Sequence, residues 1–292
     1  MKKKSSLKHT GAFWAFCAPC CILFGVFFLV PLVLSIAFSF TNYDGWKTID
    51  FVGLTNYITL FKDSKFYLSL GRTLLYTVCT LPFRVIIPLL VAVLLCSNRV
   101  VAKSLTRTMV YIPVLMSALV VGITINWMFS QEYGLVNFII RSLGGTALEW
   151  SLNPRLATFV IAFASVWASI GFNMILYIGG INSISNDLYE AATIDGANGV
   201  QAFFRITVPM LAPTTFMVVL LSTVNLLKEY ALVQGITQGG PGLSTTFIIQ
   251  YIFDKGFNQM QYGYASAIST VVMIIFALIA FAQFKVNNGG ET

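Results

Sequence analysis

The chain has 292 residues, of which 57% are hydrophobic and only 10% are charged. Soluble globular domains carry about a quarter charged residues, so this composition excludes an ordinary soluble protein and favours one that lies in a membrane. The net charge of +7 does not indicate a nucleic-acid-binding surface, because the basic residues cluster in short segments beside apolar runs.

Six apolar stretches are long enough to cross a membrane as helices. A helix rises about 1.5 Å per residue and the hydrocarbon core is about 30 Å thick, so roughly 20 residues suffice. A β-barrel would instead need short segments of alternating polarity. We therefore predict an all-α polytopic membrane protein, with a single transmembrane domain over residues 1–292. The expected spans are 13–38, 68–95, 108–129, 157–179, 209–229 and 264–284.

Two basic clusters predict how the spans are oriented. They are Lys2, Lys3, Lys4 and Lys8 before the first span, and Arg99, Lys103 and Arg107 after the second. Threading six spans places both clusters on one side, and positively charged loops mark the cytoplasmic side of a membrane. Both termini are therefore expected in the cytoplasm, with the loops 39–67, 130–156 and 230–263 outside.

The polar segment 183–209, between the fourth and fifth spans, begins with the pattern of a short helix. Ser185 or Asn186 can cap its N-terminus. Leu188, Ala191 and Ala192 recur at helical spacing and predict one small apolar face. Small side chains allow such a helix to approach another surface closely.

The second half of this segment predicts a break, another short helix and the start of a span. Gly196 and Gly199 are expected to break the first helix, because glycine accommodates the backbone turn. Residues 200–206 can form a further turn or two, with Phe203 and Phe204 as large apolar anchors. Pro209 is tolerated in the first turn of a helix and is expected to open the fifth span.

The segment 183–209 resembles the EAA loop of the permease subunits of bacterial ABC importers. The family pattern is Glu-Ala-Ala, three residues, Gly, nine residues, Ile, one residue, Leu and Pro. Val208 replaces the usual Leu, and Asp195 and Ala197 around the glycine resemble the carbohydrate branch. The positions that match the pattern are Glu190, Ala191, Ala192, Gly196, Ile206 and Pro209.

The resemblance extends over residues 12–285. Residues 51–57 resemble the first outer loop of the carbohydrate branch, and residues 262–267 resemble the entrance to its last helix. Residues 237–245, with Gly-Gly-Pro at 239–241, resemble the first permease of the maltose, multiple-sugar and glycerol-phosphate type. The chain departs from the pattern at Arg72, where the family usually has Asn before the following Thr.

The resemblance implies the partners and the mechanism. It implies a multi-pass protein of the bacterial cytoplasmic membrane that pairs with a second, similar permease. Two ATPase subunits would bind on the cytoplasmic side, and an extracytoplasmic solute-binding protein would deliver the sugar for alternating access. Docking to the ATPase would involve Glu190, Ala191, Ala192, Asp195, Gly196, Ala197, Phe203, Ile206 and Pro209. This chain would bind no ATP or Mg²⁺ itself, and it lacks the Gly-x-x-x-x-Gly-Lys-Ser/Thr phosphate-binding pattern.

Polar side chains within the spans are candidates for the substrate path. Charges inside a membrane are costly and face the bundle interior or water. Arg84 can therefore either pair with an acid or carbonyl, or contact a substrate. The resemblance implies a sugar pocket at mid-membrane, on the helices before and after the EAA loop. The candidate residues are Ser169, Phe172, Asn173, Ser222, Glu229 and Arg84.

Three alternatives differ from a sugar importer. Arg72 and Arg84 leave open an anionic substrate, such as a glycerol phosphate or a uronate. An ion-coupled secondary transporter would not need a docking loop and often has inverted repeats, which this sequence does not show. An intramembrane enzyme would need a catalytic cluster. His9 is the only histidine, and the Cys17–Cys20 pair lies in an apolar helix, so we expect no catalytic or metal site.

Overall fold

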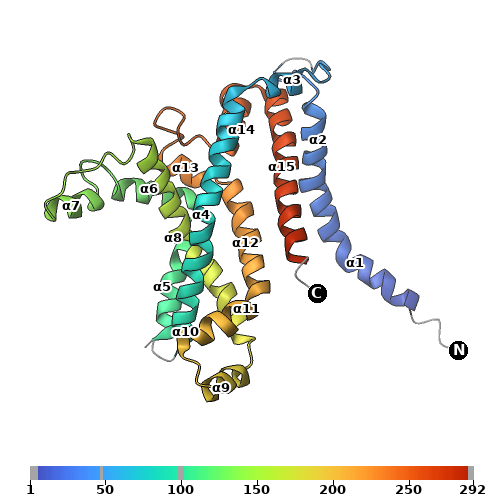
Figure 1. Ribbon diagram of the computed structural model, residues 1–292. Coiled ribbons are helices and arrows are strands. Elements are labelled where there is room, and N and C mark those ends of the chain that lie inside the picture. Colours follow the sequence, from blue (N-terminus) through green and yellow to red (C-terminus); the bar gives the residue numbers. More distant parts are fainter. Residues whose placement is uncertain (1–5, 47–48, 98–101, 289–292) are drawn as a thin grey trace. The chain divides into compact units, whose positions relative to one another are not determined.

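The computed structural model describes residues 6–46, 49–97 and 102–288, and every regular element within these ranges is helical (Figure 1). The elements, with η marking π-helical turns, are α1 (Ser6–Phe24), η1 (Gly25–Leu29), α2 (Val30–Phe38), α3 (Thr55–Phe61), α4 (Ser64–Cys96), α5 (Lys103–Leu115), α6 (Ala118–Met128), α7 (Leu135–Ser142), α8 (Pro154–Asn182), α9 (Asn186–Ile194), α10 (Gly199–Ala202), η2 (Phe203–Thr207), α11 (Val208–Met210), α12 (Ala212–Leu227), α13 (Ala231–Ile236), α14 (Ile248–Phe253), η3 (Asp254–Asn258) and α15 (Tyr262–Asn288).

The described helices confirm an all-α membrane protein with up to six spans. Four helical stretches are long and apolar enough to cross alone: Trp14–Phe38, Ser64–Cys96, Pro154–Asn182 and Tyr262–Val286. Two further crossings are each made of a bent pair of helices, so the count of six is consistent with the sequence prediction. The segments that correspond to the apolar runs 108–129 and 209–229 are bent, a feature that the runs themselves do not predict.

The third span is broken between α5 and α6, which are bent by 100°. Met116 and Ser117 have extended backbone, with ψ of 146° and 134°. A Cβ atom added at Gly122 of α6 would lie 3.0 Å from the Cα atom of Gly235 in α13. This contact between two glycines lets α6 pack directly on α13, and the hydropathy of the run gives no sign of it.

The fifth span is bent by 67° at Leu211, where the stretch Gly199–Met210 meets α12. Pro213 lies in the first turn of α12, and a proline has no N–H to continue the helical hydrogen bonds across this point. Pro209 is in the first turn of a helix, as predicted. Pro209 lies in α11, before the bend, and the long helix of this span begins at Ala212.

The chain divides into two compact units, one from residues 1–64 and 252–275 and the other from 65–251 and 276–292. In the first unit, the loop after α2 is closed by an antiparallel bridge between Thr41 and Phe51. The Asn56 side-chain amide donates to the Thr41 carbonyl oxygen at 2.8 Å. The Gly263 N–H donates to the Tyr43 carbonyl oxygen at 2.9 Å, so the start of α15 is fixed to this loop.

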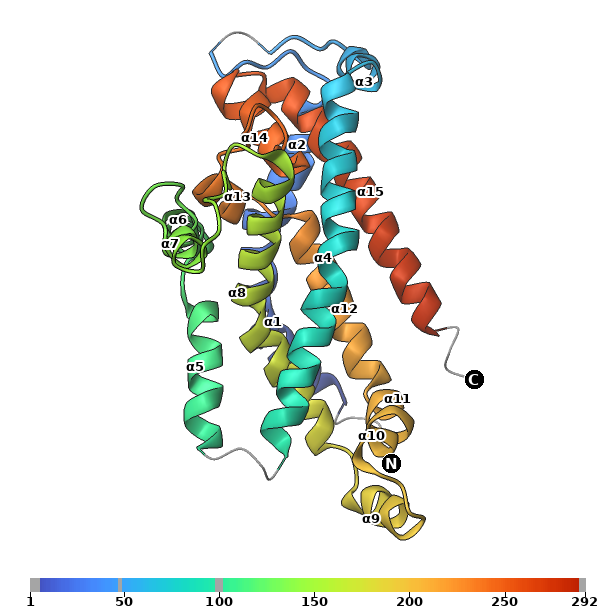
Figure 2. The ribbon, with the colours of Figure 1, turned by 60° about the vertical axis from the view of Figure 1, so that its left-hand side comes forward.

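In the second unit, α4, α8 and α12 form two apolar clusters. One contains Tyr76, Ile161 and Leu226, together with residues of α6 and α13. The other contains Tyr177 and Leu211 with neighbours on the same three helices. Figures 1 and 2 show α4 running beside α8 in both views. These clusters set the spacing of the three helices that carry the polar residues described below.

Candidate functional site

The helix α9 is defined at both ends by local hydrogen bonds. The Ser185 hydroxyl caps its N-terminus by accepting from the Asp187 N–H at 3.3 Å. At the C-terminus, Gly196 has a φ of +78°. Its N–H donates to the Thr193 carbonyl at 3.1 Å, and the Ala197 N–H donates to the Ala192 carbonyl at 2.9 Å. This pair of bonds is a Schellman motif, which requires the left-handed conformation that glycine adopts easily.

A second cap starts the next helix two residues later. The Asn198 side-chain oxygen accepts from the Gln201 N–H at 2.9 Å. The Gln201 side chain accepts from the Asn198 N–H at 2.9 Å in return, which completes a capping box. The expected sequence of helix, glycine break and second helix is therefore present. Gly199 does not contribute to the break as expected, because it is the first residue of α10.

The loop exposes a small and partly apolar surface. Glu190 and Ala191 are exposed and Ala192 is half-buried. Ile194 at the end of α9 is 87% exposed, and Phe204 is 64% exposed. These exposed side chains are available for contact with another protein.

A hydrogen bond connects α9 to the membrane-spanning part of the chain. The Tyr189 hydroxyl lies 2.9 Å from the hydroxyl of Thr207, which is buried just before α11. Tyr189 and Ile206 also pack against the apolar cluster that contains Tyr177 and Leu211. In both views, α9 and α10 lie beyond the ends of α8 and α12 (Figure 2). A force on α9 would thus reach α8 and α12 through bonded and packed side chains.

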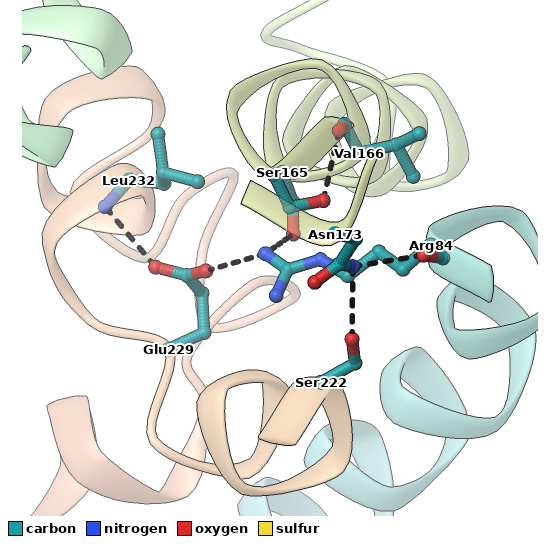
Figure 3. A network of polar contacts seen from close by, with 8 residues as sticks. Arg84, Ser165, Val166, Asn173, Ser222, Glu229 and Leu232 are labelled. Atoms are coloured by element: carbon teal, nitrogen blue, oxygen red, sulfur yellow. Dashed lines mark hydrogen bonds and ion pairs between the residues drawn. The ribbon is translucent and has the colours of Figure 1, made fainter. Parts of the chain in front are cut away.

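A polar network lies between the two apolar clusters, at the middle of α4 and α8 (Figure 3). One terminal nitrogen of Arg84 in α4 donates to the Ser165 hydroxyl of α8 at 2.5 Å. The same nitrogen lies 3.8 Å from a carboxylate oxygen of Glu229, which follows α12. The other Glu229 oxygen accepts from the Leu232 N–H at 3.4 Å. Both charged side chains are at most 10% exposed, so this is a buried ion pair.

Asn173 completes the connection between the three helices. Its side-chain amide donates to the Arg84 carbonyl oxygen at 2.9 Å and to the Ser222 hydroxyl at 3.1 Å. Asn173 and Ser222 are each only 2% exposed. The network can therefore hold α4, α8 and α12 in register, because leaving any of these buried groups unpaired would cost about 1–3 kcal/mol.

The structure brings together four of the six residues proposed for the substrate path: Arg84, Asn173, Ser222 and Glu229. The other two lie apart from this network. The Ser169 hydroxyl donates to the Val166 carbonyl of its own helix at 2.9 Å. Phe172 is 41% exposed. The sequence analysis missed Ser165, although its spacing of four residues from Ser169 and eight from Asn173 places all three on one helical face.

Comparisons with known proteins give the family and the fold. Residues 53–288 match the model of the family described as binding-protein-dependent transport system inner membrane component. The arabinooligosaccharides transport system permease protein AraP of Bacillus subtilis is 32% identical, covering 94% of this chain and 88% of that protein. The lactose transport system permease protein LacF of Rhizobium radiobacter is 32% identical, covering 93% and 92%.

A solved structure shares the fold over nearly the whole length of the chain. It is that of a bacterial ABC transporter involved in the import of the acidic polysaccharide alginate. The matched chain superposes with a TM-score of 0.85 at 24% sequence identity, and the match covers 98% of both chains.

Proposed function

The chain belongs to the family of binding-protein-dependent transport system inner membrane components, and on this basis we propose that it moves a sugar or oligosaccharide into the cytoplasm as the permease subunit of an ATP-driven importer. Two relatives that match over more than nine-tenths of the chain are named for the transport of arabinooligosaccharides and lactose. The subunit makes and breaks no covalent bonds. It forms half of the pore with a second permease, and a solute-binding protein delivers the sugar on the outer side.

The observation that carries the proposal is the doubly capped loop from α9 to α10, together with the six pattern residues between Glu190 and Pro209, which have the family spacing. We assign it the contact with one of two separate ATPase subunits, which bind the ATP and Mg²⁺. Ala191 and Ala192 allow close approach, while Ile194 offers an exposed apolar contact. When the ATPases close, the displaced α9 moves α8 and α12 through the Tyr189–Thr207 bond and the cluster beneath it. The result is alternating access.

Docking on the cytoplasmic side sets the proposed orientation. With the loop from α9 to α10 in the cytoplasm, both termini are also cytoplasmic, in a bacterial cytoplasmic membrane. The basic residues Lys103 and Arg107, both in the first part of α5, then lie on the same side, in agreement with the enrichment of positive charge on the cytoplasmic side.

The sugar path is proposed to pass beside α8 and α12. Phe172 supplies an exposed aromatic ring, and Ser169 lies half-buried one turn before Asn173. Asn173, Ser222, Arg84 and Glu229 bond one another in this state, so they reach a sugar only when the helices separate. Because the charge of the Arg84 guanidinium is already balanced by the Glu229 carboxylate, the arrangement favours a neutral sugar over an anionic one.

The direct test is transport by the reconstituted importer. The chain would be assembled with its second permease and ATPases in proteoliposomes that contain ATP, and the purified binding protein would be added outside. We expect uptake of a member of a panel of neutral di- and trisaccharides, dependent on both ATP and the binding protein. Uptake that follows a proton or sodium gradient without ATP would contradict the proposal and indicate a secondary transporter. A preference for a uronate oligosaccharide would instead support the anionic alternative.

A further inference from the structure

A long apolar groove lies between α4 and α8 in the second unit. It has a volume of about 690 Å³. Most of its lining is aliphatic or aromatic, with Leu75, Phe83, Phe159, Phe163 and Phe247 among the side chains. A sugar would find few hydrogen-bonding partners along such walls, whereas a hydrocarbon chain needs none.

The groove is long enough to hold an acyl chain from one leaflet of a membrane. Along α4 its lining runs from Arg72 to Ile87, which is about 22 Å at 1.5 Å per residue. Half of a hydrocarbon core of about 30 Å is about 15 Å. Along α8 the lining begins at Pro154, the first residue of that helix. We therefore place this end of the groove near the headgroups of the outer leaflet, and the groove is longer than an outer-leaflet acyl chain.

Positive charge is concentrated at the outer end of the groove. Arg72 and Arg155 both line it there, and none of the described residues that line it is acidic. The Arg72 guanidinium donates to the Leu243 carbonyl oxygen, but a guanidinium has five N–H donors. The hydroxyl of Ser244, next in sequence, also lines the groove and is buried without a hydrogen-bond partner among the described residues.

We propose that this groove binds an anionic phospholipid from the outer leaflet. Arg72, Arg155 and the Ser244 hydroxyl bind the phosphate, and an acyl chain lies along the apolar walls formed by α4 and α8. The two cations select an anionic headgroup, because the interaction with each basic residue near a membrane surface lowers the binding free energy. The lipid would stabilise the contact between α4 and α8 and therefore the polar network behind it. The proposal requires a membrane-spanning chain and does not depend on which solute is transported.

A cysteine within the groove provides the test. Cys79 lines the groove and is exposed. In the assembled importer, with the other four cysteines replaced by serine, the rate of Cys79 alkylation by a lipid-soluble maleimide would be measured in detergent. Phosphatidylglycerol or phosphatidylcholine would be added in increasing amounts. We expect phosphatidylglycerol to slow alkylation at a much lower mole fraction than phosphatidylcholine does.

Charge variants separate headgroup recognition from simple filling of the groove. Arg155→Gln should raise the phosphatidylglycerol needed for half-protection about fivefold, which corresponds to about 1 kcal/mol per basic residue. Arg72→Gln should act in the same direction, and neither should change protection by phosphatidylcholine. Lys62→Gln is the matched control, because this exposed lysine is outside the groove lining. The Lys62→Gln variant should need the same amount of phosphatidylglycerol for half-protection of Cys79 as the parent protein.

Two results would overturn the proposal. Equal protection by the two lipids, unchanged in Arg155→Gln, would mean that the groove has no headgroup site. Arg155 is exposed, so this variant keeps the fold and the result cannot be attributed to misfolding. Slow alkylation of Cys79 in the delipidated complex, unchanged whichever lipid is added, would mean that no lipid enters the groove in the assembled importer.

Discussion

Replacing Gly196 with valine should uncouple the ATPases from transport without preventing membrane insertion. Gly196 has a φ of +78° at the end of α9, and a Cβ atom there would meet nothing within 4 Å. The cost is therefore conformational and not steric. A left-handed backbone costs an L-residue about 1–2 kcal/mol, which lowers the population of the native loop roughly 5- to 30-fold.

The assay is sugar uptake and binding-protein-stimulated ATP hydrolysis, both normalised to the amount of assembled complex in proteoliposomes. Gly196→Val should lower both activities and weaken ATPase co-purification. Gly196→Asn should be milder, because asparagine tolerates the left-handed region better than a β-branched residue does.

Gly199→Ala is the matched control for this series. Gly199 has no positive φ, its Cβ position is equally open, and it lies in the first turn of α10. The Gly199→Ala variant should therefore transport sugar at the rate of the parent protein. If Gly196→Val transported normally, or if Gly199→Ala were as impaired as Gly196→Val, the assigned role of the Schellman turn would be refuted.

Two further substitutions test the packing and the polar network. Asn173→Ala removes the donor to the Arg84 carbonyl and the Ser222 hydroxyl, so it should destabilise the protein by about 1–3 kcal/mol. This would be measured as a lower thermal midpoint of the purified complex, and an unchanged midpoint would show that the network does not hold the helices. Gly263→Ala places a Cβ atom 2.1 Å from the Thr41 carbonyl oxygen. This overpacking should lower the stability of the protein by about 1–3 kcal/mol and therefore the yield of assembled complex. Gly71→Ala, with nothing within 4 Å, should assemble normally, and equal yields of the two variants would contradict the close approach.

The sequence predicts the number of crossings but not their shape. Apolar runs show which segments can lie in lipid, and they located the straight helices α4, α8 and α15 to within a few residues at most ends. The bend between α5 and α6 depends on the packing of α6 against α13, a contact between residues more than one hundred positions apart. Hydropathy averaged along a run carries no information about such a contact.

The capped loop could be predicted in more detail, because its determinants are local. Serine before the helix and glycine after it act through hydrogen bonds to residues at most five positions away. The pairing within the membrane was harder to predict. The sequence left open whether Arg84 pairs or binds a substrate, and the fold selects Glu229 as its acidic partner. Ser165 was overlooked, although its spacing of four residues from Ser169 and eight from Asn173 is a local signal that places it on the same helical face.

The most direct test of the central claim is site-specific photo-cross-linking from the exposed end of α9. A photoreactive amino acid at Ile194, which is 87% exposed, should cross-link to the ATPase subunit in the assembled importer. The same probe at Tyr133, which is 89% exposed in the loop before α7, should not cross-link to the ATPase. An ATPase cross-link from Tyr133 and none from Ile194 would contradict both the coupling role of α9 and the orientation of the chain.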